Sequence, residues 1–176
     1  MRSKSVHFMI GAALSAAFLA ACGDSASDAR KAAAESRGLQ AKLPEELSGL
    51  PSITSRECNF EMVDAQWFHG SESISIASNL GHTFQGWIIR KDAGEVPEKL
   101  WVRLTAADAL SLYGSAVERV ERPDVAAVYG EAFANAGFKL SSQAGALTPG
   151  GYRLAVVALS KGHALVCDPG MRINVN

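Results

Sequence analysis

The sequence predicts a mainly β fold, an antiparallel β-sandwich that carries one short helix. Short runs rich in apolar, β-branched and aromatic residues recur at close intervals, and glycines and prolines separate them. This pattern is typical of strands joined by turns. One stretch, near residues 123–129, carries helix signals instead. Seven or so strands with this spacing indicate two sheets packed face to face.

Residues 1–21 have the pattern of a signal peptide. Arg2 and Lys4 precede an uncharged run over residues 8–19, which is too short to cross a bilayer as a permanent helix. The run ends in Leu19-Ala20-Ala21-Cys22, which resembles the lipobox of bacterial lipoproteins. This resemblance implies that Cys22 receives a diacylglyceryl group and becomes the mature N-terminus. An ordinary secretory signal with an incidental cysteine is the alternative.

The same resemblance implies a location. One acyl chain holds a protein to a bilayer only marginally, whereas further acylation, commonly by palmitate on the new amine, makes the attachment stable. In lipoproteins of bacteria with two membranes, an aspartate directly after the lipidated cysteine often retains the protein in the inner membrane. Gly23 occupies that position here. We therefore expect a protein of the bacterial cell envelope, lipid-anchored in the outer membrane.

Residues 22–57 are predicted to form the lipidated N-terminus and a flexible or partly helical tether. Ser27 could cap a short helix over residues 29–35, and prolines and glycines interrupt the sequence that follows. A flexible chain of ~35 residues would reach about 30–35 Å on average. As an alternative, four leucines at helical spacing could form an amphipathic helix that docks on the domain, although a proline interrupts this pattern: Leu39, Leu43, Leu47 and Leu50.

Residues 58–176 are predicted to form the β-sandwich domain. The runs with strand character, in chain order, cover residues 58–63, 73–77, 83–90, 100–104, 152–159, 164–167 and 172–175. The helix prediction depends on Pro123 in a first helical turn, Asp124 near the positive end of the helix dipole, and Gly130 as a stop.

Two cysteines remain if Cys22 carries lipid. Cys58 and Cys167 are then an even pair in an exported protein, which predicts one disulfide. Two buried free thiols are the alternative. The only histidine near either cysteine is His163, so the spacing indicates no metal site.

Four short motifs together resemble an immunoglobulin-like sandwich module found in bacterial envelope proteins, including some glycosyltransferase-associated membrane proteins. They are Gly86-Trp87, the segment 122–126, Gly137-Phe138 and the segment 149–154. The resemblance spans residues 73–168. Where this family has an acidic residue soon after the Gly-Trp strand, the chain has Arg90-Lys91-Asp92. The resemblance implies an architecture and little chemistry.

The sequence contains no motif that indicates catalysis. It has no Gly-x-Ser-x-Gly elbow, no phosphate-binding glycine loop and no His-Glu-x-x-His helix. We therefore predict no catalytic residue and no cofactor. With 17 basic and 18 acidic residues, the chain also has no basic surplus that would indicate nucleic acid as a partner. A hydrolase is the alternative function, with a site that folding assembles from carboxylates and the dispersed His69, His82 and His163.

Four residues are candidates for ligand binding. Trp67 and Phe68 form an aromatic pair in an expected loop, where binding residues concentrate, although they could equally close one end of the sandwich. Arg122 and Asp124 could bind a ligand or form a local ion pair. The resulting hypothesis is a lipid-anchored, non-catalytic sandwich that binds an envelope protein or a glycan, or gives structural support.

Overall fold

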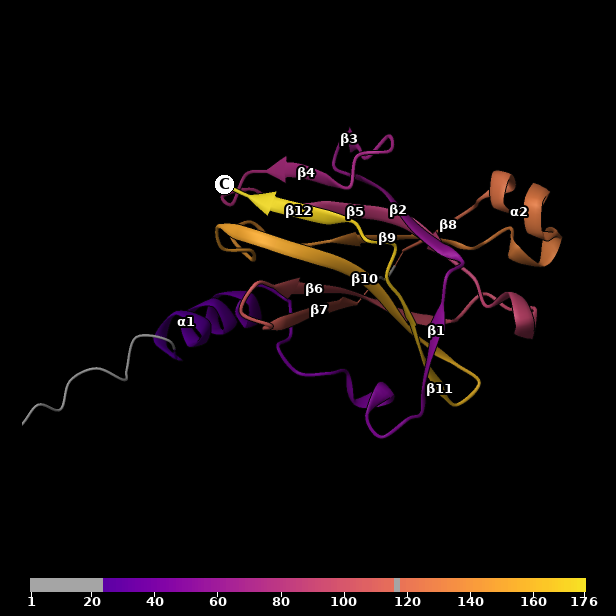
Figure 1. The fold of residues 1–176 in the computed structure, drawn as a ribbon, viewed down its shortest axis with the longest axis horizontal. Coiled ribbons are helices and arrows are strands. Elements are labelled where there is room, and N and C mark those ends of the chain that lie inside the picture. The colour runs from indigo at the N-terminus through magenta and orange to yellow at the C-terminus, as the bar shows by residue number, and fades with distance from the viewer. Residues whose placement is uncertain (1–23, 116–117) are drawn as a thin grey trace, which may run out of the picture.

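The computed structural model describes residues 24–115 and 118–176. Its strands form two β-sheets that pack face to face (Figure 1). The predicted signal peptide and the predicted lipidation site, Cys22, lie outside these residues. No helix in the described ranges is long and apolar enough to cross a membrane.

Seven strands form the first sheet and five form the second. The first contains β1 (Ser52–Ser55), β4 (Ser73–Ile76), β6 (Lys99–Ala106), β7 (Ser111–Ser115), β10 (Gly150–Ser160), β11 (His163–Cys167) and β12 (Arg172–Val175). The second contains β2 (Cys58–Val63), β3 (Gln66–Trp67), β5 (Thr83–Ile88), β8 (Glu118–Val120) and β9 (Gly137–Ser141).

The long strand β10 is the centre of the first sheet. It pairs with β6 along one side, and on the other side it pairs first with β12 and then with β11. Two outer pairings, β1 with β11 and β4 with β12, are parallel. All other pairings between the named strands are antiparallel, as predicted; these two differ because long segments of chain, and not hairpins, join β1 and β4 to their partners.

The strand order supports the immunoglobulin-like prediction. The path β2-β5-β9-β8 matches the order A-B-E-D of one immunoglobulin sheet, and β7-β6-β10-β11 matches C′-C-F-G of the other. The predicted mainly β, immunoglobulin-like sandwich is thus confirmed. The position of the disulfide differs, because antibody domains link strands B and F, whereas the cysteines here lie on the counterparts of A and G.

This disulfide, between Cys58 on β2 and Cys167 on β11, was predicted from the even cysteine pair and is confirmed. It joins the two sheets across a Cα–Cα distance of 6.3 Å and a sequence separation of 109 residues. Both cysteines are buried. The main core between the sheets is built from aromatic and aliphatic side chains; Phe60 packs edge-on against Phe138, with ring centroids 5.6 Å apart.

Strand β5 shows how the sequence pattern positions this core. Its residues alternate between half-buried and buried, so that Phe84, Gly86 and Ile88 face inward. Gly86 is required by close packing, because a Cβ atom there would lie 2.1 Å from the carbonyl oxygen of Asn59. Trp87, the next residue, points to the opposite face and packs near Tyr129.

The segment before β2 contains a helix, as predicted, but it is packed on the domain and is not a free tether. Helix α1 spans Asp24–Glu35, and Leu39 and Leu47 are both buried. Leu47 packs with Trp101 and other residues on the outer face of the first sheet. The structure is closer to the alternative prediction, in which the leucine segment docks on the domain, although the leucines form no continuous helix. Pro44 begins a 3₁₀ turn, η1 (Glu45–Leu47), in place of one.

Further contacts show that the folded domain begins before residue 58. Gln40 pairs with Tyr113 beside β7, and β1 adds a strand next to β11. The folded unit therefore includes the residues from about 34 to 57, because Ala34 is buried in the main core and the apolar side chains that follow cover a sheet face that water would otherwise contact. The predicted boundary at residue 58 is too late.

The predicted helix near residues 123–129 is confirmed as α2 (Pro123–Tyr129). Gly130 follows its last residue, and the backbone N–H of Gly130 donates to the carbonyl of Ala126. Two 3₁₀ turns complete the structure, η2 (Lys91–Ala93) and η3 (Glu131–Phe133).

Candidate functional site

The turns η2 and η3, helix α2 and the β10–β11 turn gather at one end of the sandwich, which we call the α2 end (Figure 1). Specific contacts hold these segments together. Lys161 in the β10–β11 turn donates to the carbonyl of Ala93 at 3.0 Å, and the Lys91 ammonium lies 5.6 Å from the centre of the Tyr129 ring. The α2 end combines segments that specific contacts hold together with exposed side chains, which makes it the candidate site.

A small satellite core fixes α2 to this end. Val125 of α2, Phe133 of η3 and the buried Ile89 and Ala136 form one apolar cluster. Tyr129 extends it, with its ring 5.9 Å from that of Trp87 and 6.4 Å from that of Phe133. Helix α2 has only seven residues and would not persist alone in water. Its position therefore depends on this cluster.

Arg122, directly before α2, is the main polar link between the helix and the second sheet. Its two terminal nitrogens donate to the carboxylate of Glu61 on β2 at 2.9 and 2.7 Å, and its Nε donates to Asp124 at 2.8 Å. A side-chain hydrogen bond from Arg122 lowers the pKa of Asp124 to about 2, and the same bond raises the pKa of Arg122. Both groups are therefore charged at neutral pH.

Glu61 reaches Arg122 because of a β-bulge. The register between β2 and β5 shifts between Phe60 and Met62, which leaves Glu61 as the extra residue. A bulge re-aims the side chain that it contains. The backbone carbonyl of Glu61 also accepts a hydrogen bond from the N–H of Phe68 at 2.9 Å. Arg122 thus contacts the carboxylate of Glu61, and Phe68 contacts its backbone. Asp124 shares Arg122 with Glu61, and Trp67 pairs with Met62, the next residue of β2.

The four candidates differ in what they offer a ligand. Phe68 is 2% exposed and belongs to the main core, so its role in the loop is packing. Trp67 is 50% exposed, and its ring stacks on that of His69 with centroids 5.6 Å apart. Arg122 is largely buried, and its donors are occupied by Glu61 and Asp124. The side chain of Asp124 is 63% exposed, which leaves it accessible.

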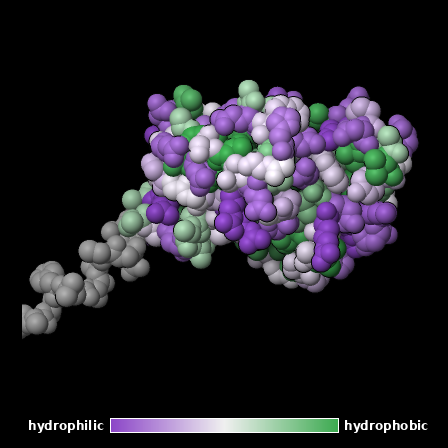
Figure 2. All heavy atoms as spheres, turned by 45° about the horizontal axis from the view of Figure 1, so that its top comes forward, coloured by the Kyte–Doolittle hydropathy of each residue, from purple (hydrophilic) through white to green (hydrophobic). Residues whose placement is uncertain are grey.

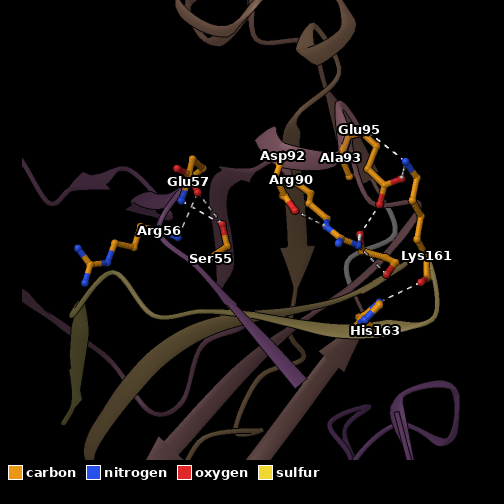
Figure 3. Close-up of polar contacts among 10 residues, drawn as sticks. Ser55, Arg56, Glu57, Arg90, Asp92, Ala93, Glu95, Lys161 and His163 are labelled. Carbon is orange, nitrogen blue, oxygen red and sulfur yellow. Dashed lines mark hydrogen bonds and ion pairs between the residues drawn. The ribbon is translucent and has the colours of Figure 1, made fainter. Parts of the chain in front are cut away.

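A second polar network ties η2 to the β10–β11 turn (Figure 3). Arg90 donates to the hydroxyl of Ser160 at 3.0 Å and to its carbonyl at 3.2 Å. The Ser160 hydroxyl donates in turn to the carboxylate of Glu95, which also lies 3.4 Å from the ammonium of Lys161. Ser160 is buried. Its hydroxyl therefore serves as a fixed link between two charged groups.

A nearby turn between β1 and β2 is closed by a smaller network, which Figure 3 also shows. Ser55 donates to the carboxylate of Glu57 at 3.0 Å, and the N–H of Glu57 donates back to the Ser55 hydroxyl at 3.1 Å. The side chain of Arg56, between them, points away from this pair in the figure and is exposed.

Helix α2 exposes a large apolar side chain and lies beside a hollow. Val128 is 74% exposed, the highest value among the exposed large apolar side chains of the described ranges. A shallow hollow of about 380 Å³ lies beside the helix, lined by Glu121, Pro123, Ala126, Ala127, Glu131 and Ala134. Figure 2 shows a hydrophobic area at the end of the molecule that α2 occupies, surrounded by hydrophilic residues. We call this surface the α2 face.

The histidines have separate surroundings. His82 is buried, with its ring nitrogens 2.8 Å from a carboxylate oxygen of Asp64 and 2.7 Å from the carbonyl of Ala77. His163 lies 3.0 Å from the carbonyl of Lys161, and His69 stacks on Trp67. The described part of the chain also contains no group of three or more His, Cys, Asp or Glu residues that could hold a metal ion.

Sequence reasoning missed Glu61, Val128 and the network around Arg90. Nothing in the local sequence marks Glu61 as a bulge, because a bulge depends on the partner strand. The Arg90-Lys91-Asp92 segment was a usable signal, since it departs from the pattern that the sandwich resemblance leads one to expect. The hydrogen-bond partner of Arg90, Ser160, is 70 residues away in the sequence, so local sequence could not identify it.

No protein-family model matches the chain, and neither does any curated protein sequence. A solved structure that is similar is the first immunoglobulin domain of the mouse polymeric immunoglobulin receptor. The match has 9% sequence identity and a TM-score of 0.33, and it covers 69% of this chain and 96% of that one. The immunoglobulin-like strand order follows from the strand pairings alone.

Proposed function

We propose that the chain is a lipid-anchored protein of the bacterial envelope whose sandwich is a non-catalytic binding module, with the α2 face as its binding surface. The observation that supports binding most directly is the exposed Val128 on a helix that Arg122 and a satellite core hold in place. A rigid surface loses little conformational freedom when a partner docks, which favours binding.

The chemistry of the α2 face favours a protein partner. This face combines the exposed Val128 with three carboxylates: Glu121 and Glu131 line the hollow, and Asp124 is exposed in the first turn of α2. A complementary surface would present an apolar side chain with Lys or Arg beside it. The inter-sheet disulfide supports export, because such bonds persist in oxidising compartments outside the cytoplasm. The Leu19-Ala20-Ala21-Cys22 motif supports the lipid anchor.

The anchor is tested by a Cys22→Ser variant in the bacterium that carries the chain. We expect the original protein to incorporate a labelled fatty acid and to sediment with membranes, and the variant to do neither. Globomycin should stop processing of the original protein only. Unchanged processing and unchanged membrane attachment in the variant would contradict the anchor.

Binding is tested with a photo-crosslinking amino acid in the full-length protein, placed at Val128 or, as a matched control, at Leu80. Leu80 is also a large, exposed apolar residue, at 56%. We expect one defined protein adduct at Val128 that is absent at Leu80 and is lost when Ala127 is replaced by Asp. An adduct with a glycan at Val128 would show binding of the other proposed class. Equal labelling at both positions, or adducts insensitive to Ala127→Asp, would overturn the α2 face as the binding surface.

A further inference from the structure

We infer that helix α1 holds the opposite end of the sandwich against the headgroups of the lipid bilayer, so that the α2 face points away from the membrane. This inference rests on the proposed anchor at Cys22. We call the opposite end the loop end; it consists of the β4–β5, β6–β7 and β9–β10 loops, at residues 77–82, 107–110 and 142–149. In Figure 1, α1 and the C-terminus lie on this side, and α2 lies on the other.

Three contacts attach α1 and the residues directly after it to the loop end. Arg30 forms an ion pair with Asp108 of the β6–β7 loop at 2.9 Å. Arg37 donates to the carbonyl of Gly145 in the β9–β10 loop at 2.9 Å. Ala34, between them, is completely buried in the main core cluster. The helix is therefore attached to the loop end through its C-terminal half and is not a free segment.

The burial of α1 has the spacing of a docked helix. Ser27, Arg30, Lys31 and Ala34 are half-buried or buried, and residues three and four apart share one helix face. Ala29, Ala32 and Glu35, on the other side, are exposed. Asp108 pairs with Arg30 of α1, so charge as well as burial favours this orientation of the helix.

The loop end is a continuous surface. The N–H of Ser142 donates to the carbonyl of His82 at 2.7 Å, which joins the β9–β10 loop to the β4–β5 loop. The N–H of Ser78 donates to the carbonyl of Asn176 at 2.9 Å, which adds the C-terminus. Leu80 stands out from this surface with 56% of its area exposed. An apolar side chain in this position suits the boundary between lipid headgroups and acyl chains.

The length of chain between the lipid and α1 makes this surface the membrane-facing one. Gly23 is the only residue between Cys22 and the first residue of α1, Asp24. A helix rises about 1.5 Å per residue, so the path from Asp24 to the buried Ala34 is about 15 Å. The predicted flexible tether would have reached about 30–35 Å. A short, docked helix therefore limits both the height and the orientation of the domain.

The test uses the full-length lipidated protein in liposomes of phosphatidylethanolamine and phosphatidylglycerol that contain a lipid with a nitroxide headgroup. A fluorophore is attached to a single added cysteine, in Leu80→Cys or Val128→Cys, with the Cys58–Cys167 disulfide intact. We expect quenching at position 80 to exceed quenching at position 128 several-fold. Inserting ~12 Gly and Ser residues between Gly23 and Asp24 should remove most of this difference.

An exchange of charges tests the role of α1 itself. Arg30→Asp should reduce the difference in quenching, and Arg30→Asp combined with Asp108→Arg should restore it. Similar quenching at positions 80 and 128 in liposome-bound protein would overturn the inference and leave the anchor intact. Failure of the protein to stay with the liposomes would overturn the proposed anchor instead.

Discussion

Arg122 is the residue on which the start of α2 depends. Its guanidinium group is shared between Glu61 in the second sheet and Asp124 in the first turn of the helix. Removing it would leave the half-buried carboxylate of Glu61 without its cationic partner, which is costlier than losing an exposed ion pair. Asp124 is more exposed, and its contribution is correspondingly smaller.

The Arg122–Asp124 pair should make stability depend on pH in the acid range. Because the pKa of Asp124 is lowered to about 2 in the folded state, it lies below the value of ~3.9 in the unfolded chain. The carboxylate therefore adds stability that is fully present above about pH 4 and is lost as the pH falls toward 2. Given its exposure, we expect the gain at neutral pH to be about 1 kcal/mol or less.

Urea unfolding of the original protein and Asp124→Asn across this pH range measures the effect. The difference in unfolding free energy should be constant near neutral pH and shrink as the pH approaches 2. Asp92→Asn, which removes another surface carboxylate paired with an arginine, is the matched control for the change in net charge. A difference that grows on acidification would contradict the assignment.

The sequence made only part of this cluster predictable. Arg122 and Asp124 are two residues apart around Pro123, so their pairing follows from local geometry. Glu61, the third residue of the cluster, could not be predicted from local sequence. Glu61 becomes the bulged residue through the register of β2 on β5, and that register is set by which side chains of both strands enter the core.

The disulfide connects strands that lie at different positions in their sheets. Cys58 begins β2 in the second sheet, and Cys167 ends β11 in the first, where β1 covers the other side of β11. The link therefore holds together both sheets and the strand pairings nearest the N-terminal segment. Since it closes a loop of more than 100 residues, it should restrict the unfolded chain strongly.

Replacing both cysteines with alanine should lower the unfolding free energy by about 2–5 kcal/mol. Urea unfolding, followed by Trp fluorescence and circular dichroism, measures the loss. Chemical reduction of the original protein provides the control, because it removes the bond and retains both sulfur atoms. Equal stability of the reduced and oxidised proteins would show that the bond adds nothing to the fold.

The sequence predicted the strands whose polar and apolar residues alternate clearly. It did not predict the strands that form only because a neighbouring strand pairs with them. Strand β5 was expected because its inward and outward residues differ in type. Strands β1, β3, β7 and β8 were not, since they contain two to five residues and include many polar ones. Such segments become strands when a neighbouring edge offers backbone hydrogen bonds, as β11 does for β1.

Across the whole molecule, the two ends have different tasks in the function that we propose. The loop end receives α1 and, through it, the proposed anchor, while the α2 end holds a short helix rigidly with its apolar face exposed. The sandwich separates the two ends by the length of its strands, and β10 alone has eleven residues, or about 35 Å of extended chain. The domain itself thus provides the reach that the sequence suggested for a tether.

Stability measurements can show where the folded unit begins. A chain that begins at Cys58 lacks β1, Leu39 and Leu47, which leaves the edge of β11 open and uncovers Trp101 and Tyr113. Burying one large apolar side chain contributes about 1.5–3 kcal/mol, so the loss should amount to several kcal/mol. An open, apolar strand edge should also promote aggregation.

A chain that begins at Gly38 separates this effect from that of α1. It retains both leucines and β1 and loses Ala34 and the two arginine contacts, so we expect it to remain close to the longer chain in stability. Urea unfolding and gel filtration of chains that begin at residues 24, 38 and 58 compare the three. If the chain that begins at residue 58 has the same unfolding free energy as the other two, the N-terminal leucines add no stability, and the domain begins at Cys58.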